Sequence, residues 1–393
     1  MTAWQSTAQV HYSGLKPDTA ILQAVYSPTY DSDPLPDTVH VPFAGYDLTW
    51  QNGADRRTHS VLQTPCFTGS VIVDANYSYS FNNPIDNTVI GSTALARDNE
   101  IEVSYVGLGG DFNYRGAHAR LMTQFGSRSI VVPRNDYSPY RGQYSLGNAY
   151  RYVSEAYAGY HFNKWYGVNV DAGLFMSYLG LNSYYQVENW EYQASFTSDN
   201  TPWFFNGLRV QVYPTRTVKL EGWLINGWQS YGRLNSMPGF GGNITWMPNE
   251  RLKLLTNDYY GTDAAGIPDR KRFHSDNSLL YRYCNRPDKK GISRAAFSAT
   301  ADLGFEQGGG VTAFGGDSVT PAQHFLSAMV YHRLWFDHNR YAWTVGGGVM
   351  NNPGRYLVLY PTGQASPLPD PNNPTKTEGA FPFSAAPGDK FSG

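Results

Sequence analysis

The predicted strands of this chain are joined alternately by short and long connections, and this alternation restricts the fold more than any other feature. The short connections are rich in turn-forming residues and span 115–117, 163–166, 214–217, 248–251, 286–290 and 337–340. The long connections span roughly 83–100, 126–150, 178–203, 227–238, 262–275, 307–322 and 352–390. A transmembrane β-barrel has this asymmetry, because its tight turns lie on one side of the membrane and its long loops on the other.

The segments between these connections alternate in polarity with a period of two. In residues 71–82, Val73, Ala75 and Tyr77 fall on one parity and polar residues fill most of the other. The pattern recurs at 168–176, 208–212 and 297–306, and it is typical of strands with one apolar and one wet face. Thirteen strands are predicted to start near Phe67, Ile101, His118, Tyr152, Val168, Asn206, Val218, Gly239, Leu252, Asn277, Ser293, Gln323 and Tyr341. The fold class is therefore all-β, an antiparallel transmembrane barrel.

Composition agrees with an all-β chain and excludes several other classes of protein. Aromatic residues make up 15% of the chain and charged residues only 16%, with 40 Gly and 24 Pro among the 393 residues. No apolar stretch reaches the roughly 18 residues of a membrane-spanning helix. The net charge of −2 gives no basic field for nucleic acid. Two cysteines are too few for a disulfide framework.

Aromatic residues cluster near the predicted strand ends. The clusters are Tyr77, Tyr79 and Phe81, Tyr160 and Phe162, Tyr259 and Tyr260, Tyr281 and Tyr283, and Trp335 and Phe336. Barrels place aromatic girdles at both lipid interfaces, where a ring can be half apolar and half wet. The alternative for any one residue is that aromatics favour strands and fill cores.

The chain divides into an irregular, proline-rich segment over residues 1–66 and a barrel over residues 67–393. Thirteen strands is an odd number, whereas bacterial single-chain barrels have an even number. We therefore expect Phe391 to open strand fourteen, after a long loop, and the complete barrel to have 14 or 16 strands. The start of this chain carries no signal peptide pattern.

Several short motifs between Gly173 and Gly261 resemble a known family. They are Gly-Leu-Phe-Met-Ser-Tyr at 173–178, Phe-Thr-Ser-Asp-Asn-Thr-Pro-Trp at 196–203, Gly-Leu-Arg-Val-Gln-Val-Tyr-Pro at 207–214, Ile-Asn-Gly-Trp-Gln at 225–229 and Asn-Asp-Tyr-Tyr-Gly at 257–261. The chain resembles the OmpL-like β-barrel porins of Gram-negative outer membranes from about Phe67 to its end. The resemblance implies an outer-membrane barrel that admits small polar solutes, and it carries over no active-site residue.

The residues themselves give no sign of catalysis or of a cofactor. The chain lacks the HExxH, P-loop, GxSxG and EF-hand patterns, and its nine histidines are scattered singly. Carboxylates such as Asp171 and Glu221 lie on predicted strands with nothing to mark them as a catalytic pair. We expect no enzyme activity, no metal and no cofactor.

Charged residues on the strand parity opposite the apolar row are candidates to line a pore. They are Asp74, Arg120, Glu155, Asp171, Arg209, Lys219, Glu221, Arg282, Asp302 and Glu306. Opposed acidic and basic rows would create a transverse electric field in the pore. Such a field favours polar solutes and changes the ratio of cation flow to anion flow. The alternative is that these charges pair across strands and only hold the wall together.

Two long loops are candidates to fold inward and narrow the pore. The loop from Tyr178 to Trp203 combines rings and acids that could stack and bind a sugar-like ligand: Tyr184, Tyr185, Glu188, Trp190, Glu191 and Tyr192. The loop from Ser127 to Arg151 carries Arg128, Arg134, Asp136 and Arg141, and its positive excess would favour anions. The sequence does not show which of the two loops narrows the pore.

These patterns predict an outer-membrane porin for passive diffusion of small hydrophilic solutes. Its partners would be outer-membrane lipid and small polar solutes, without nucleic acid, and it could form a homo-oligomer. The alternative is an all-β carbohydrate-binding or structural protein, either soluble or a plugged barrel, that transports nothing.

Overall fold

A computed structural model of the chain describes residues 40–57, 60–81, 87–89, 92, 95–133, 136, 138 and 142–354, and the backbone of 365–370 and 373–379. One sheet of thirteen antiparallel strands dominates the described chain. The strands are β1 (Phe67–Ser78), β2 (Glu100–Tyr114), β3 (Ala117–Thr123), β4 (Val153–Phe162), β5 (Val168–Met176), β6 (Phe204–Thr215), β7 (Val218–Ile225), β8 (Gly239–Asn249), β9 (Leu252–Gly261), β10 (Lys271–Asn285), β11 (Ile292–Gln307), β12 (His324–Phe336) and β13 (Tyr341–Asn351).

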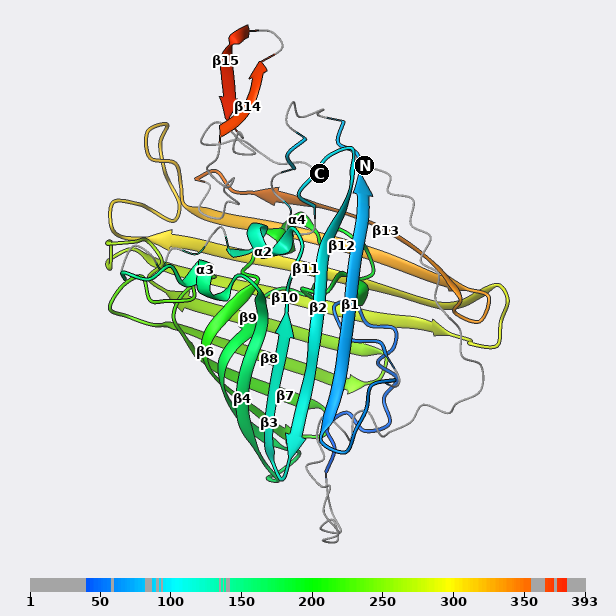
Figure 1. Ribbon diagram of the computed structural model, residues 1–393. Helices are drawn as coiled ribbons and strands as arrows, with labels where there is room; N and C mark the ends of the chain where they lie inside the picture. The colour runs from blue at the N-terminus through cyan, green and yellow to red at the C-terminus, as the bar shows by residue number, and fades with distance from the viewer. Residues whose placement is uncertain are drawn as a thin grey trace.

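Each strand pairs with its neighbours in the sequence, and the sheet is strongly curved (Figure 1). This up-and-down order is that of antiparallel barrels. The predicted all-β antiparallel fold with thirteen visible strands is confirmed. Within the described residues β1 and β13 are the two edges of the sheet and do not pair with each other.

The predicted strand starts agree with the structure except at β10. The predictions at Val168, Val218, Gly239, Leu252 and Tyr341 coincide with the first residues of their strands. In contrast, β10 begins at Lys271 instead of the predicted Asn277. Its first six residues, Lys-Arg-Phe-His-Ser-Asp, contain a single large apolar residue, so they show no apolar alternation although they pair fully with β11.

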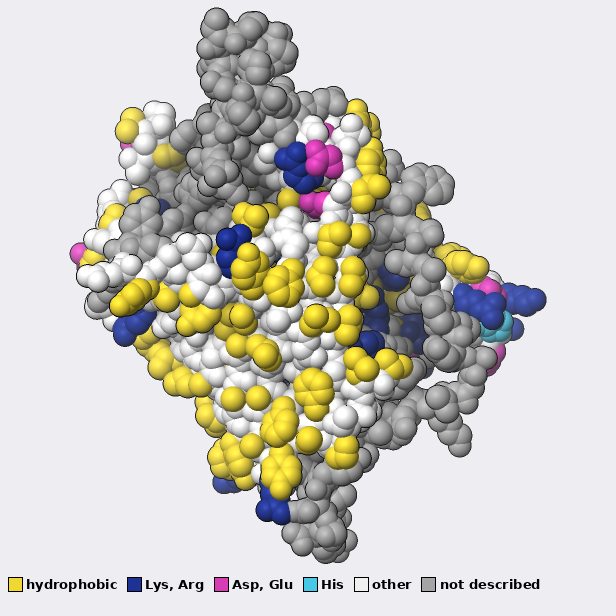
Figure 2. All heavy atoms as spheres, viewed as in Figure 1, with side chains coloured by type: hydrophobic (Ala, Val, Ile, Leu, Met, Phe, Trp, Pro, Cys, Tyr) yellow, Lys and Arg dark blue, Asp and Glu magenta, His cyan; other side chains and the backbone are white. Residues whose placement is uncertain are grey.

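The two faces of the sheet differ in chemistry. On β6, Leu208 and Val210 are exposed on the outer face, while Arg209 between them lies on the inner face and pairs with Asp171. Apolar side chains cover much of the outer surface in Figure 2. Such a surface is stable against lipid chains, whereas monomeric soluble proteins rarely expose large apolar patches.

Two members of the predicted aromatic girdle face the interior instead. Tyr259 and Trp335 are 1% and 5% exposed and belong to interior clusters, whereas Tyr260 is exposed on the outer face. The period of two requires this, because adjacent residues of a strand cannot both face outward. The girdle prediction is wrong at these two residues.

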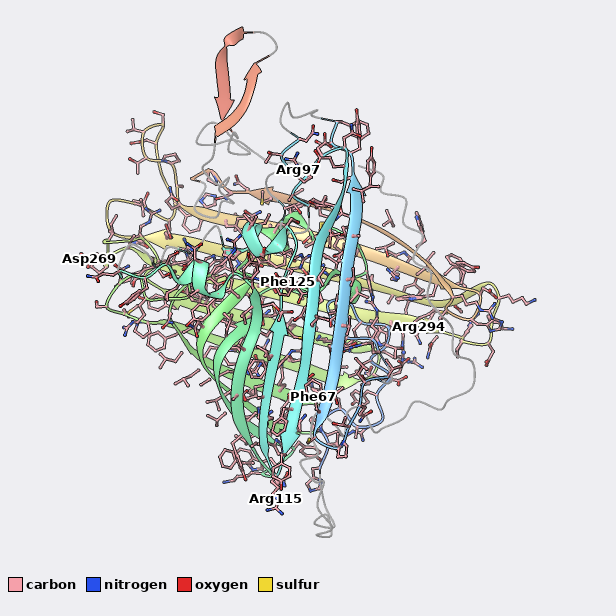
Figure 3. All side chains as sticks on the ribbon, in the orientation of Figure 1. Phe67, Arg97, Arg115, Phe125, Asp269 and Arg294 are labelled. Atoms are coloured by element: carbon pink, nitrogen blue, oxygen red, sulfur yellow. The ribbon has the colours of Figure 1, made fainter. Side chains whose placement is uncertain are left out.

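Short turns lie at one end of the sheet and long loops at the other. The β2–β3 turn consists of Arg115 and Gly116, both at positive φ, the geometry of a type I′ turn that matches strand twist. Figure 3 shows Arg115 at the lower tip. The described parts of the long loops hold four short helical segments: α2 (Arg128–Val131), α3 (Leu146–Tyr150), η3 (Gln186–Glu188) and α4 (Phe196–Asp199). Among the described residues no helix is long and apolar enough to cross a bilayer.

The segment after β13, predicted as one long loop, contains two further strands. They are β14 (Ala365–Asp370) and β15 (Asn373–Gly379), which pair with each other as a separate hairpin. This hairpin lies within the predicted long connection, and Asp370 pairs with Asn373 at its tip. Phe391 and residues 1–39 of the predicted pre-barrel segment lie outside the described residues.

Candidate functional site

All ten charged residues predicted to line a pore lie on the inner face of the sheet. Asp171, Arg282, Asp302 and Glu306 are among the most buried of them. The inner-face set is Asp74, Arg120, Glu155, Asp171, Arg209, Lys219, Glu221, Arg282, Asp302 and Glu306. The placement follows from the period of two, since their sequence neighbours on the strands are exposed on the outer face.

These charges are paired along the wall. Arg120 donates to Asp111 at 2.7 Å and to Glu155 at 2.6 Å. Arg209 donates twice to Asp171, which lies directly opposite it on β5, at 2.9 and 2.8 Å. Such cross-strand ion pairs stabilise neighbouring strands against each other.

The remaining wall charges also have polar partners. Lys219 donates to Glu221 at 2.8 Å, and Arg272 donates to Glu306 at 2.8 Å. Asp302 lies 3.4 Å from His274. The arrangement fits the alternative of charges that hold the wall together, and the effect of these residues on ion selectivity stays a prediction.

Residues 40–57, which we call the lumen segment, lie against the inner wall at the short-turn end. Phe43 N donates to Arg216 O in the β6–β7 turn at 2.8 Å, and Trp50 Nε1 donates to Glu250 O in the β8–β9 turn at 3.0 Å. Trp50 is fully buried, and the guanidinium of Arg282 lies 5.5 Å from its ring centroid. The barrel interior is therefore occupied by this segment at that end.

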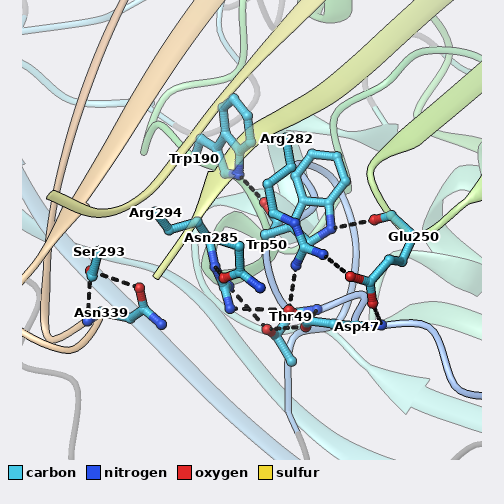
Figure 4. A network of polar contacts seen from close by, with 10 residues as sticks. All are labelled: Asp47, Thr49, Trp50, Trp190, Glu250, Arg282, Asn285, Ser293, Arg294 and Asn339. Carbon is cyan, nitrogen blue, oxygen red and sulfur yellow. Dashed lines mark hydrogen bonds and ion pairs between the residues drawn. The ribbon is translucent and has the colours of Figure 1, made fainter. Parts of the chain in front are cut away.

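Ion pairs fasten the lumen segment to β10 and β11 (Figure 4). The carboxylate of Asp47 pairs with Arg282 and, at 3.1 Å, with Arg294. Thr49 donates to Asp47 from its backbone N–H at 3.0 Å and from its hydroxyl at 2.6 Å. Burial alone would raise the pKa of Asp47, but Arg294, Thr49 and Arg282 together hold that pKa below its usual value. Asp47 is therefore charged at neutral pH.

The loop between β5 and β6, residues 177–203, reaches into the interior and meets the lumen segment; we call it the inner loop. Trp190 N donates to Asn52 Oδ1 at 2.7 Å, and Trp190 Nε1 donates to Trp50 O at 2.9 Å. On the other side, Trp190 O accepts from Arg333 on β12 at 2.5 Å and from Thr344 on β13 at 3.1 Å. Trp190 therefore connects β12 and β13 to the lumen segment through hydrogen bonds of its backbone and its side chain.

Arg56 binds the inner loop by its backbone. Its guanidinium donates to the carbonyl oxygens of Val187 at 2.6 Å, Glu188 at 2.5 Å and Asn189 at 3.2 Å. Three consecutive carbonyl oxygens at the end of η3 match the geometry of the arginine guanidinium, which offers several hydrogen-bond donors in fixed directions. The inner loop and the lumen segment thus form one hydrogen-bonded unit.

Two acids of the inner loop have unusual pKa values. Burial raises the pKa of Glu188 and that of Glu191 to about 7. Ser183 donates to Glu188 at 2.5 Å, and Asn182 donates to Glu191. Both groups therefore change charge near neutral pH while the loop is docked.

The aromatic residues predicted for a constriction are packed against the wall. Tyr185 OH donates to Glu155 at 2.5 Å, Tyr192 OH donates to Asp74 at 2.6 Å, and Tyr184 OH donates to Gln124. The rings of Tyr184, Tyr185 and Trp190 are 3%, 6% and 2% exposed. In this arrangement those three rings have no open face on which a sugar could stack.

The second candidate loop, Ser127–Arg151, supports the inner loop. The guanidinium of Arg128 is buried 4.7 Å from the ring centroid of Tyr184 and donates to Tyr184 O. Asp136 accepts from Tyr231 N at 3.1 Å. Arg134 and Arg141 lie outside the described residues. Arg128 thus holds the neighbouring loop and does not face open space.

Comparison with protein families gives a match over most of this sheet. Residues 67–337, more than half of the chain, match the family described as putative β-barrel porin-2, OmpL-like. The chain belongs to this porin family. The resemblance seen in its motifs is therefore confirmed, and membership implies an outer-membrane location. No curated protein matches the chain.

The part of this porin that matches the family starts at the first residue of β1 and ends just after β12. Asp47, Trp50 and Arg56 precede it, and no sequence pattern singles them out. They lie in an irregular stretch, and their partners are 130 to 250 residues away in the chain, as for Arg56 with Asn189 and Asp47 with Arg294.

Proposed function

We propose that this porin lets small hydrophilic solutes diffuse passively across the outer membrane. The observation that carries the proposal is the division of one antiparallel sheet into an apolar outer face and a charged inner face, as on β6. A soluble barrel would invert this order, whereas a membrane barrel requires it. Family membership supports the same conclusion.

The proposal includes a constriction formed by the inner loop and the lumen segment. Their contact at Trp50 and Trp190 narrows the space that a solute can use, and Arg56 keeps the two together. Charged wall residues such as Arg209 and Glu221 would then act on solutes that pass close to the wall. A narrow, polar passage favours small hydrophilic solutes over large or apolar ones.

Swelling of proteoliposomes tests this proposal. Liposomes that contain the full chain are mixed with isosmotic solutions of arabinose, glucose, sucrose and stachyose. We expect swelling with the monosaccharides and little or none with the tetrasaccharide. No swelling with any solute, from protein whose circular dichroism shows folded β-structure, would refute passive transport.

The contact between Trp50 and Trp190 also favours a second candidate, a plugged barrel that transports nothing. The same assay separates the two when it is repeated on a chain that lacks residues 40–57. Swelling by both proteins supports the porin, whereas swelling by the shortened protein alone shows that the lumen segment closes the barrel.

A further inference from the structure

Each of the six short turns carries at least one exposed Lys or Arg. The exposed cations are Arg115, Lys164, Arg216, Arg251, Arg286, Lys289, Lys290 and Arg340. The same turns contain the acids Glu250, Asp288 and Asp337, and Glu250 is already paired with Arg282. The tip at the right of Figure 2 shows such cations gathered beyond the apolar surface. The short-turn end therefore presents excess positive charge at the border of the apolar face.

A cavity of about 500 Å³ lies beside two of these cations, Arg251 and Arg286. Its apolar lining comes from Tyr283, Ile292, Ala295 and Leu334. In the part of the chain that the structure describes, no acidic side chain lines this cavity.

Strand register places the apolar lining on the outer face. Trp335 packs on Trp190 inside the barrel, so its neighbour Leu334 faces outward. Ala295 pairs with Leu334 across β11 and β12, and paired residues share a face. Ala295 is small, and the register shift between Arg282 and Cys284 places Tyr283 at a bulge beside it. The result is a depression in the outer surface where the sheet meets its turns.

The two arginines at the rim have no ion-pair partner among the described residues. Among the described residues neither Arg251 nor Arg286 forms an ion pair, and both are exposed. Arg282 also lines the cavity, but Asp47 and Glu250 neutralise its charge. Two unpaired guanidinium groups above an apolar depression complement a phosphate that carries acyl chains, since guanidinium groups bind phosphate by paired, charge-assisted hydrogen bonds.

We propose that this cavity binds one glycerophospholipid of the leaflet that faces the short turns. Arg251 and Arg286 hold its phosphate, and an acyl chain lies along Tyr283, Ile292 and Leu334. The inference rests on the proposed function to the extent that the outer face must contact a membrane. The apolar lining favours a lipid over free phosphate, which would gain nothing from it.

Native mass spectrometry of the full chain in detergent tests the proposal. The protein is titrated with dioleoylphosphatidylglycerol, with dioleoylglycerol, which has the same chains but no phosphate, and with inorganic phosphate as a competitor. We expect retention of one phosphatidylglycerol, at least tenfold weaker retention of dioleoylglycerol, and little competition by millimolar phosphate. Equal retention of the two lipids, or loss of the lipid to millimolar phosphate, would overturn the proposal.

Variants localise the binding to the cavity. The double substitution R251Q/R286Q should weaken retention of phosphatidylglycerol about tenfold, and R251K/R286K should restore part of it because the charge is kept. The control is R233Q, which removes an exposed arginine from the loop between β7 and β8 at the opposite end. Unchanged retention in R251Q/R286Q would refute the site. Liposome swelling measured on the same preparations separates this failure from a failure of the porin function.

Discussion

At the scale of single residues, a few buried charges hold the lumen segment and the inner loop in place inside the barrel. Asp47 neutralises two arginines of the wall, and Arg56 binds three carbonyl oxygens of the inner loop. Buried charges are costly unless they are paired, so removal of one partner leaves the other uncompensated. These residues are therefore the most sensitive points of the lumen segment.

We expect Asp47→Asn to loosen the lumen segment. Loss of a partner in a fully buried ion pair costs about 3–5 kcal/mol, and we expect about 2 kcal/mol here because Arg282 keeps Glu250. Trypsin can cleave after Arg56 only when the segment leaves the wall, so cleavage should become about 30-fold faster. Asp288→Asn, in an exposed turn, is the matched control. Equal cleavage rates in all three proteins would contradict this role of Asp47.

The raised pKa values of Glu188 and Glu191 predict a pH-dependent channel. Each pKa is about 7 when the loop is docked, against an ordinary value of 4.5, so the docked loop binds protons more tightly than a free loop. Docking is therefore strongest at low pH and weakens as pH rises from about 4.5 through 7. We expect conductance to rise by up to about twofold between pH 5 and pH 8.

The variant E188Q/E191Q removes both titrating groups and tests the cause of this change. Its conductance should stay nearly constant between pH 5 and pH 8, because a neutral amide does not ionise. A conductance of the unmodified protein that falls with rising pH, or a variant that keeps the full pH response, would disprove the assignment to these two acids.

At the scale of elements, strands build the wall and the inner loop controls the space within it. The inner loop contacts β12 and β13 through Trp190, β1 through Tyr192 and β4 through Tyr185. Contacts to strands on several sides of the barrel hold the loop across the interior. A loop anchored at so many points acts as a fixed constriction at low pH.

Shortening the inner loop should widen the passage. Replacement of residues 183–192 by a Gly-Ser-Gly linker removes Trp190 and the three tyrosines that reach the wall, so we expect single-channel conductance to rise about twofold or more. The control shortens the β11–β12 loop by removal of the exposed residues 315–319. A conductance that both deletions leave unchanged would show that the inner loop is no constriction.

The strands were predictable from the sequence, but the contents of the barrel were not. A period of two is a local signal, so the starts of β5, β7, β8, β9 and β13 could be read directly. It failed at Lys271, where both faces of the strand are polar. The girdle prediction failed at Tyr259, which the same period of two turns inward. The parity also placed Arg209 and Asp171 on the inner face, but their pairing required the register between β5 and β6.

The position of the lumen segment depends on contacts between distant parts of the chain. Asp47 and Arg294 are 247 residues apart, and no local sequence pattern in the irregular stretch before Phe67 predicts their contact. The inner loop could be named as a candidate from its rings and acids. The sequence could not show that those rings point toward the wall and away from open space.

At the scale of the whole molecule, the sheet separates a lipid-facing surface from a polar interior, and tryptophan residues report on both. Trp246 and Trp343 are exposed on the outer face and Trp165 is exposed in the β4–β5 turn, whereas Trp50, Trp190 and Trp223 are buried. Interfacial and lipid-facing rings can be quenched by brominated lipid chains, and interior rings cannot.

We expect brominated phosphatidylcholine to quench the fluorescence of the reconstituted protein only in part. Trp246→Phe should lower the quenched emission by about a third, because it removes one of the three exposed tryptophan rings among the described residues. Trp223→Phe, a buried ring, should reduce the unquenched emission instead. The opposite assignment, with quenching lost in Trp223→Phe and kept in Trp246→Phe, would mean that the faces of the sheet are inverted.

The proposed channel is an ion-permeable barrel whose interior is narrowed by the lumen segment and the inner loop. Single-channel recording in planar bilayers tests it most directly, with the unmodified chain and a chain that lacks residues 40–57 measured side by side. We expect discrete conductance steps for the unmodified chain and steps about twofold larger for the shortened chain. Equal steps would contradict a narrowing by the lumen segment, and the absence of steps from both folded proteins would contradict the porin itself.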